Sequence, residues 1–189
     1  MKNSKKMPVA KTTNLSSNTA VQPFQQQLEE NEKSALLLSF LNNIDMAIEI
    51  GFMNYGRKSS ILKTAIKYNQ DIITGEFPNL AIDYAKVIIS KGSLYSPLAK
   101  IIKPTSLGCI NVWWYFDAEQ ENPNDRATIL MYNPEKQDYM FVTGLVRRED
   151  RGFCYNRTKR DLNCVMHVYL FFVSEDKKSV SDSIYLGKK

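Results

Sequence analysis

The sequence predicts an α+β fold, in which N-terminal helices pack on one face of a C-terminal antiparallel sheet. Apolar residues recur at steps of three and four between residues 37 and 73, which is the period of an amphipathic helix. After Pro104 the step changes to two, the period of a half-buried strand. The helical segments precede the strands without alternating with them, and short loops join successive strands. This order favours an antiparallel meander with the helices on one side.

A length of 189 residues, of which 43% are hydrophobic, is enough for one domain with an ordinary core. We place this domain at residues 28–189 and a flexible basic arm at residues 1–27. The arm is rich in Ser, Thr, Asn, Gln and Lys, so it buries too little apolar surface to offset its ordering entropy. Residues 1–20 contain no acidic side chain and four basic ones: Lys2, Lys5, Lys6 and Lys11.

Three helices and a short fourth are expected before the strands. Their expected bounds are Glu29 to Gly51 or Gly56, residues 60–74, Leu80 to Gly92, and Pro97 to just before Pro104. In the first helix, Leu37, Leu41 and Ile44 share one face, and glutamates near its start suit the helix dipole. Glycine supplies the left-handed conformation that commonly ends a helix, and proline favours the first helical position.

Four to five strands are expected after Pro104. They cover residues 110–116, 127–132, 139–147 and 163–173, with a short edge strand at 183–186. Asn122, Pro123 and Asn124 mark an exposed turn after the first of these strands.

The charge of the chain is uneven. Its 25 Lys and Arg against 20 Asp and Glu give a net charge of +5, and residues 147–160 alone contain six basic and two acidic side chains. This basic stretch joins the third and fourth expected strands, so we expect it to project as a long hairpin or loop. Arginines contact phosphates while aromatic rings offer faces on which bases stack, a combination suited to single-stranded nucleic acid. The candidate nucleic-acid or anion-binding residues are Arg147, Arg148, Arg151, Phe153, Tyr155, Arg157, Lys159 and Arg160. The same arginines would also suit acids on a protein partner, an anionic membrane surface, or a merely solvated loop.

A run of four aromatic residues at 113–116 predicts a second surface. If the helices cover Trp114 and Phe116, the alternate residues of the strand face outward. The residues expected on this exposed face are Trp113, Tyr115, Tyr169 and Phe171. An exposed aromatic patch is typical of an interface with a protein partner or a second copy. The alternative is a sheet covered on both faces.

No motif for a cofactor, a metal or catalysis is evident. Residues 51–60 resemble a phosphate-binding loop, but Arg57 separates Gly56 from the lysine, and a helix rather than a strand precedes the segment. His167 is the only histidine, and Cys164 lies three residues before it, so their side chains face opposite sides of a strand. We therefore expect no cofactor, no metal site and no catalytic residues.

The three cysteines form no C-x-x-C pair, and an odd, sparse count favours a reducing compartment. Buried thiols are favoured over a bridge between Cys154 and Cys164 across a hairpin. Neither a signal peptide nor a membrane span is recognised, so a cytoplasmic location is expected, or the virion for a viral protein.

These patterns favour a non-enzymatic assembly or adaptor protein. It would bind nucleic acid or an anionic membrane surface through the arm and the basic stretch, and a protein partner or itself through the aromatic face. A flexible basic arm on a small body is also a layout of viral structural proteins. The alternatives are a dedicated partner or chaperone subunit of a larger complex, and an enzyme without a linear motif.

Overall fold

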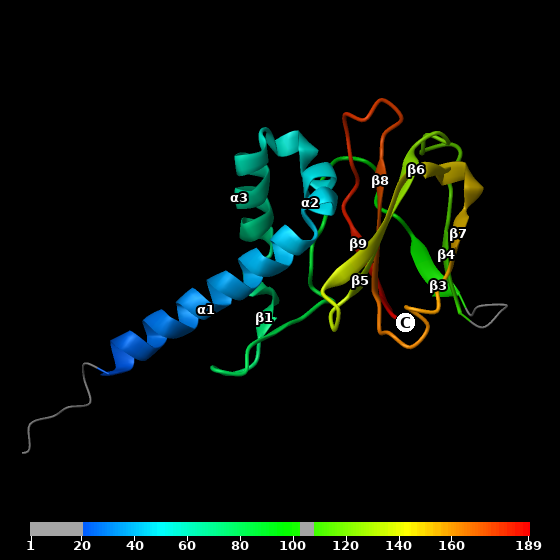
Figure 1. The fold of residues 1–189 in the computed structure, drawn as a ribbon. Helices are drawn as coiled ribbons and strands as arrows, with labels where there is room; N and C mark the ends of the chain where they lie inside the picture. The colour runs from blue at the N-terminus through cyan, green and yellow to red at the C-terminus, as the bar shows by residue number, and fades with distance from the viewer. Residues whose placement is uncertain (1–20, 103–107) are drawn as a thin grey trace, which may run out of the picture.

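The computed structural model describes residues 21–102 and 108–189, and it confirms a mixed α+β fold with helices before a strand-rich region (Figure 1). The helices are α1 (Val21–Asn43), α2 (Asp45–Gly51) and α3 (Lys58–Tyr68), with one-turn 3-10 helices η1 (Met53–Tyr55), η2 (Gln70–Ile72) and η3 (Arg148–Asp150). The strands are β1 (Ile73–Thr74), β2 (Ala81–Ile82), β3 (Ala99–Ile102), β4 (Cys109–Trp114), β5 (Arg126–Asn133), β6 (Asp138–Arg147), β7 (Gly152–Asn156), β8 (His167–Val173) and β9 (Ile184–Lys188).

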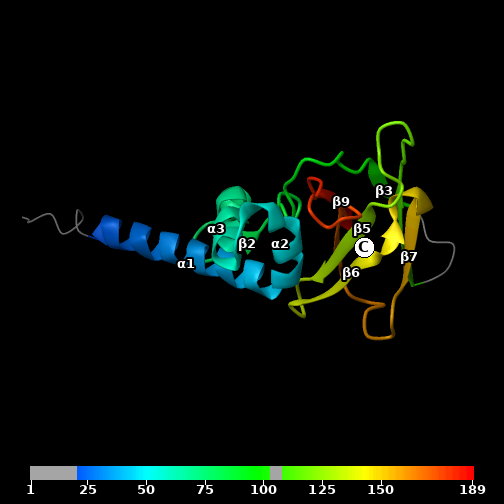
Figure 2. The ribbon, with the colours of Figure 1, turned by 90° about the horizontal axis from the view of Figure 1, so that it is seen from above.

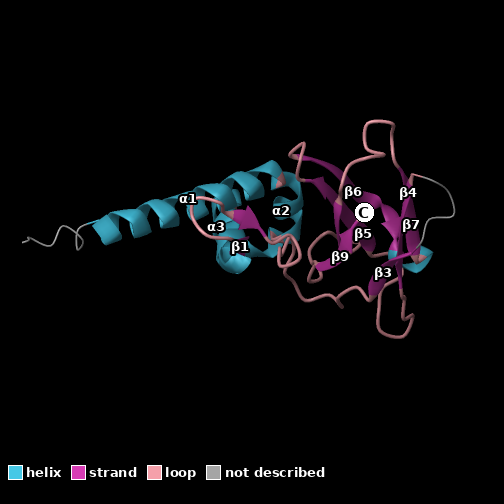
Figure 3. Cartoon of the chain, turned by 90° about the horizontal axis from the view of Figure 1, so that it is seen from below, coloured by secondary structure: helices cyan, strands magenta, loops and turns pink. Residues whose placement is uncertain are grey.

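The strands form two main antiparallel sheets rather than one meander. One sheet has the order β6-β5-β8-β9 and the other β3-β4-β7, while β1 and β2 make a small separate pair. The reason is β7, which lies inside the expected loop and pairs along β4, from Cys109↔Asn156 to Trp113↔Gly152. Pairing with β3 and β7 places β4 in its own sheet (Figures 1 and 3).

The four-stranded sheet is the middle layer of the molecule and is covered on both faces. Leu130, Tyr169 and Phe171 belong to the core shared with the helices, which we call the helix-side core. Ile129 and Leu170 face the other way, into an intersheet core shared with the three-stranded sheet. Strands buried on both faces carry continuous apolar runs, and the residues of β8 after His167 are all buried.

The helices pack beside this sheet, and the first half of α1 projects away from the body (Figures 1 and 2). The second half of α1 packs on the body through its buried side chains Leu37, Phe40 and Leu41. In the first half, Phe24 is 66% exposed. Residues 21–27, which the sequence assigns to the flexible arm, form the first turns of α1. The predicted arm lysines Lys2, Lys5, Lys6 and Lys11 lie outside the described residues.

The prediction of a third helix at residues 80–92 and a short fourth one after Pro97 is wrong. Residues 80–92 run mostly as an extended, irregular segment, and the residues after Leu98 form β3. The buried side chain of Asn69 explains the extended segment, because its amide exchanges hydrogen bonds of 2.8 and 2.9 Å with the backbone of Ile88. The Ser183 hydroxyl accepts the backbone N–H groups of Ile89 and Ser90 at 3.0 and 3.2 Å. These distant partners satisfy the backbone without helical bonds.

Within the described residues, no helix combines the length and the apolar character needed to cross a membrane.

Candidate sheet-face binding site

The basic stretch at residues 147–160 does not project as a loop. It leaves the end of β6, makes the single turn of η3, and then forms β7 in the three-stranded sheet (Figure 1). The side chains of residues 147–156 are therefore placed by the alternation of a strand or by the turn of η3, while Arg157, Lys159 and Arg160 lie in the irregular segment after β7.

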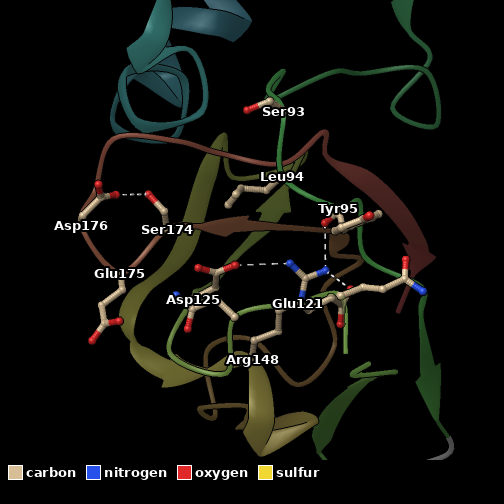
Figure 4. A pocket seen from close by; sticks show the side chains of 11 residues that line it. Ser93, Leu94, Tyr95, Glu121, Asp125, Arg148, Ser174, Glu175 and Asp176 are labelled. Atoms are coloured by element: carbon tan, nitrogen blue, oxygen red, sulfur yellow. Dashed lines mark hydrogen bonds and ion pairs between the residues drawn. The ribbon is translucent and has the colours of Figure 1, made fainter. Parts of the chain in front are cut away.

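The prediction that Arg148 contacts an external anion is wrong, because its side chain is 1% exposed. Its Nη2 donates to the backbone oxygen of Tyr95 at 2.9 Å and pairs with Glu121, and its Nη1 lies 3.5 Å from the Asp125 carboxylate (Figure 4). The guanidinium carbon also lies 4.1 Å from the ring centroid of Phe172. Burial raises the pKa of the Asp125 carboxyl, and the neighbouring Arg148 acts in the opposite direction. Arg148 thus links three segments inside the molecule.

Most of the other basic side chains of the stretch also have internal partners. Arg147 pairs with Glu149, and Arg160 pairs with Asp138 at 3.0 Å. Arg157 donates to the backbone oxygens of Leu162 and Cys164 at 3.2 and 3.4 Å. Two exposed basic residues of the stretch have no ion pair among the described residues: Arg151 and Lys159.

The two aromatic residues of the stretch point inward. Tyr155 is 9% exposed in the intersheet core, and its hydroxyl donates to Asp161 at 3.0 Å. Phe153 is half-buried against the same core. Their assignment as stacking faces for bases is wrong, because β7 is a strand that turns both residues toward the four-stranded sheet.

Of the four residues expected on the exposed aromatic face, two are exposed and two are buried. Trp113 is 38% and Tyr115 52% exposed, while Trp114 between them is fully buried. The prediction that Tyr169 and Phe171 are exposed is wrong, since both lie in the four-stranded sheet and are fully buried under the helices. The second layer of strands explains this outcome: the helices cover the four-stranded sheet, and Trp113 lies on the outer side of the three-stranded one.

This outer face of the three-stranded sheet is the candidate site. We define it by the exposed or half-exposed residues of β3, β4 and β7 and of their ends: Leu98, Lys100, Cys109, Asn111, Trp113, Tyr115, Arg151, Gly152, Cys154 and Asn156. In the register, Lys100 and Gly152 flank Trp113 on either side. The Lys100 ammonium lies 5.6 Å from the Trp113 ring centroid, a cation–π distance. Gly152 has no side chain to cover the indole.

A shallow groove of about 400 Å³ runs beside Trp113 and includes Asn111, Arg151 and Gly152 in its lining. Arg151 has a left-handed backbone and holds its guanidinium carbon 5.9 Å from the Phe116 ring centroid. The outer face therefore combines two exposed rings with two cations, one on each side of Trp113.

Sequence reasoning missed Lys100, because residues 99–102 were expected to be helical. Had they been predicted as a strand, the alternation of Ala99, Lys100 and Ile101 would have placed Lys100 outward.

A second cavity, of about 650 Å³, lies beside Arg148 and is lined by carboxylates and hydroxyls that include Glu175 and Ser174 (Figure 4). Its buried arginine is already paired, so we assign it a structural role. Among the residues that the structure describes, no three His, Cys, Asp or Glu side chains come together as a metal site.

The model of a family of unknown function, DUF6266, matches residues 12–187 of the chain. No curated protein and no solved structure matches it.

Proposed function

This chain belongs to the DUF6266 family, whose function is unknown, and we propose that it is a non-enzymatic assembly or adaptor protein that binds single-stranded nucleic acid on the outer face. The observation that supports this proposal is the position of Lys100 and Arg151 on either side of the exposed Trp113. Trp113 and Tyr115 of the aromatic run and Arg151 of the basic stretch, which look like parts of two surfaces in the sequence, share one face of the fold.

The chemistry of this face suits unpaired bases. An exposed indole or phenol ring stacks on any base, and this contact contributes about 1–3 kcal/mol per base. The cations beside the ring neutralise phosphates along the strand. Asn111 and Asn156 add amide donors and acceptors for base edges. In this proposal the lysines of the N-terminal segment add phosphate contacts, and the protein acts in the cytoplasm.

One observation favours a protein partner as a second candidate. Leu98 is 72% exposed, and its backbone oxygen accepts the N–H of Tyr115 at 2.8 Å, so an aliphatic and an aromatic side chain lie together at one end of the face. Exposed aromatic residues with arginine nearby are typical of protein interfaces. Such an interface would respond little to salt, unlike phosphate binding.

The test is a fluorescence-anisotropy titration of a labelled single-stranded RNA with the full chain, at about 50 and 200 mM salt. With phosphate contacts from Lys100 and Arg151 alone, affinity should fall roughly sevenfold between these concentrations, since the slope is about −0.7 per phosphate for single strands. Trp113→Ala should weaken binding by about tenfold through lost stacking. Tyr95→Ala is the matched control, because Tyr95 is 57% exposed but lies beside Arg148 rather than on the outer face.

Absence of binding at the lower salt concentration, or equal binding by Trp113→Ala and the unmodified chain, would overturn the nucleic-acid proposal. The protein-interface candidate predicts instead a concentration-dependent association in sedimentation that Leu98→Ser abolishes and salt leaves unchanged.

A further inference from the structure

Two cysteines lie together on the outer face. Cys109 on β4 is paired in the register with Asn156 on β7, and Cys154 is paired with Asn111, so the two thiols are diagonal neighbours on the same side of the sheet. The Oδ1 atom of Asn156 lies 2.8 Å from the Cys109 sulfur and 3.8 Å from the Cys154 sulfur. One amide oxygen thus accepts both thiol protons. Cys154 is exposed and Cys109 is half-exposed, so both can be reached from outside.

The diagonal arrangement does not suit a disulfide bond. Diagonal neighbours in an antiparallel pair have Cα atoms about 7–8 Å apart, whereas a disulfide needs about 4.4–6.8 Å. Forming one would require the two strands to shift against each other. An ion held between the sulfurs needs no such shift. Two metal–sulfur bonds in series bridge a longer distance between the sulfur atoms than the single S–S bond of a disulfide.

The local environment also argues against a thiol that reacts with peroxides. Burial and the neighbouring Cys109 raise the pKa of the Cys154 thiol. Redox-sensing and nucleophilic cysteines need the opposite shift, because the thiolate is the reactive form. A tightly bound soft metal ion displaces the thiol protons and so overcomes a raised pKa.

We propose that Cys109 and Cys154 form a two-coordinate site for a soft monovalent metal ion, and that this ion is copper(I). Thiolate sulfur is the donor that copper(I) prefers, and two thiolates complete a coordination shell that zinc would leave half empty. On binding, two Cu–S bonds form, two S–H bonds break, and both protons pass to water. No atom changes its oxidation state. The Asn156 amide, which accepts the thiol protons in the metal-free protein, is released.

The site is tested by titrating the reduced full-length chain with copper(I) under anaerobic conditions, against bicinchoninate as a coloured competitor. The expected result is one copper(I) per chain. Cys109→Ser and Cys154→Ser should each weaken binding by roughly a hundredfold, since loss of a ligand costs at least as much as loss of an outer-shell partner. Cys164→Ser is the matched control, because Cys164 is buried and its thiol donates to the Arg160 backbone oxygen at 3.4 Å.

Circular dichroism checks that each variant is folded, and the exposed position of Cys154 makes its serine variant the safer of the two. Three results would each overturn the proposal: no copper(I) binding, binding unchanged in Cys154→Ser, or one copper(I) shared by two chains. Zinc(II), titrated against a coloured zinc chelator, should bind the unmodified chain no more tightly than it binds Cys154→Ser. The outcome is independent of the RNA titration, so either proposal can fail alone.

Discussion

Arg148 is a basic residue that the fold uses as an internal link. Its side chain joins the Tyr95 backbone to Glu121 and Asp125, and its own backbone oxygen accepts the Trp114 indole N–H at 2.7 Å. The residue thus connects the segment before β3, the turn before β5 and the end of β4. In the sequence it is one of six similar charges, and only the buried partners distinguish it from Arg147.

Replacing Arg148 with methionine should destabilise the protein by about 3–5 kcal/mol, because Glu121 and Asp125 would remain buried without a cation. Urea unfolding measures this change. The matched control is Arg147→Met, which removes a surface pair with Glu149 and should cost no more than about 1 kcal/mol. Equal stabilities of the two variants would contradict an internal role for Arg148.

His167 is half-buried between two tyrosines. Its Nδ1 lies 2.9 Å from the Tyr185 hydroxyl, and its ring centroid lies 4.2 Å from that of Tyr84. Burial, together with the charge of Lys188, lowers the pKa of His167 below its usual value of 6.5. At His167 the unfolded chain therefore binds a proton more readily than the folded one. Protonation then favours the unfolded state, so the free energy of unfolding decreases as the pH falls below 6.5.

Folding free energy measured from about pH 7.5 down to about 5.5 should decrease, with a slope of at most about 1.4 kcal/mol per pH unit from this residue. His167→Gln should flatten the profile, and the comparison is clean because the chain contains one histidine. A profile with the same slope in both proteins would show that other groups cause it.

At the scale of elements, prediction succeeded where burial imposes a regular pattern. The strands β4, β5, β6 and β9 lie within a few residues of their expected positions, since alternation or an apolar run marks each of them. The expected strand at 163–173 begins only at His167, because residues 158–164 form turns first.

Prediction failed where distant residues decide the structure. The segment at 80–92 has helical apolar spacing, yet Asn69 and Ser183 hold its backbone extended from far along the chain. The strand β7 presents only two inward aromatic residues between a glycine and an asparagine, a pattern too short to distinguish from a loop.

The candidate site was predictable in part for the same reason. Alternation along β4 identified Trp113 and Tyr115 as outward residues. Lys100 and Arg151 supply the positive charges beside these rings. Their positions depend on the pairing of β4 with β3 and β7, which no local pattern reveals.

At the scale of the whole molecule, the four-stranded sheet connects two cores that would otherwise be separate. Along β5, Ile129 belongs to the intersheet core and its neighbour Leu130 to the helix-side core, and both are fully buried. Among the residues that the structure describes, neither the helices nor the three-stranded sheet has another large apolar layer to pack on. Each outer layer therefore depends on the same central strands.

We accordingly predict that both cores unfold in one transition. The two tryptophans lie on β4, so their fluorescence reports on the three-stranded sheet, whereas helical circular dichroism reports on α1, α2 and α3. Ile129→Ala and Leu130→Ala each remove a buried aliphatic side chain and should cost about 2–5 kcal/mol. If the sheet couples the cores, either substitution shifts the fluorescence and dichroism curves together. A shift of the dichroism curve alone in Leu130→Ala would mean instead that the helical layer unfolds by itself, and that the three-stranded sheet with its outer face persists without it.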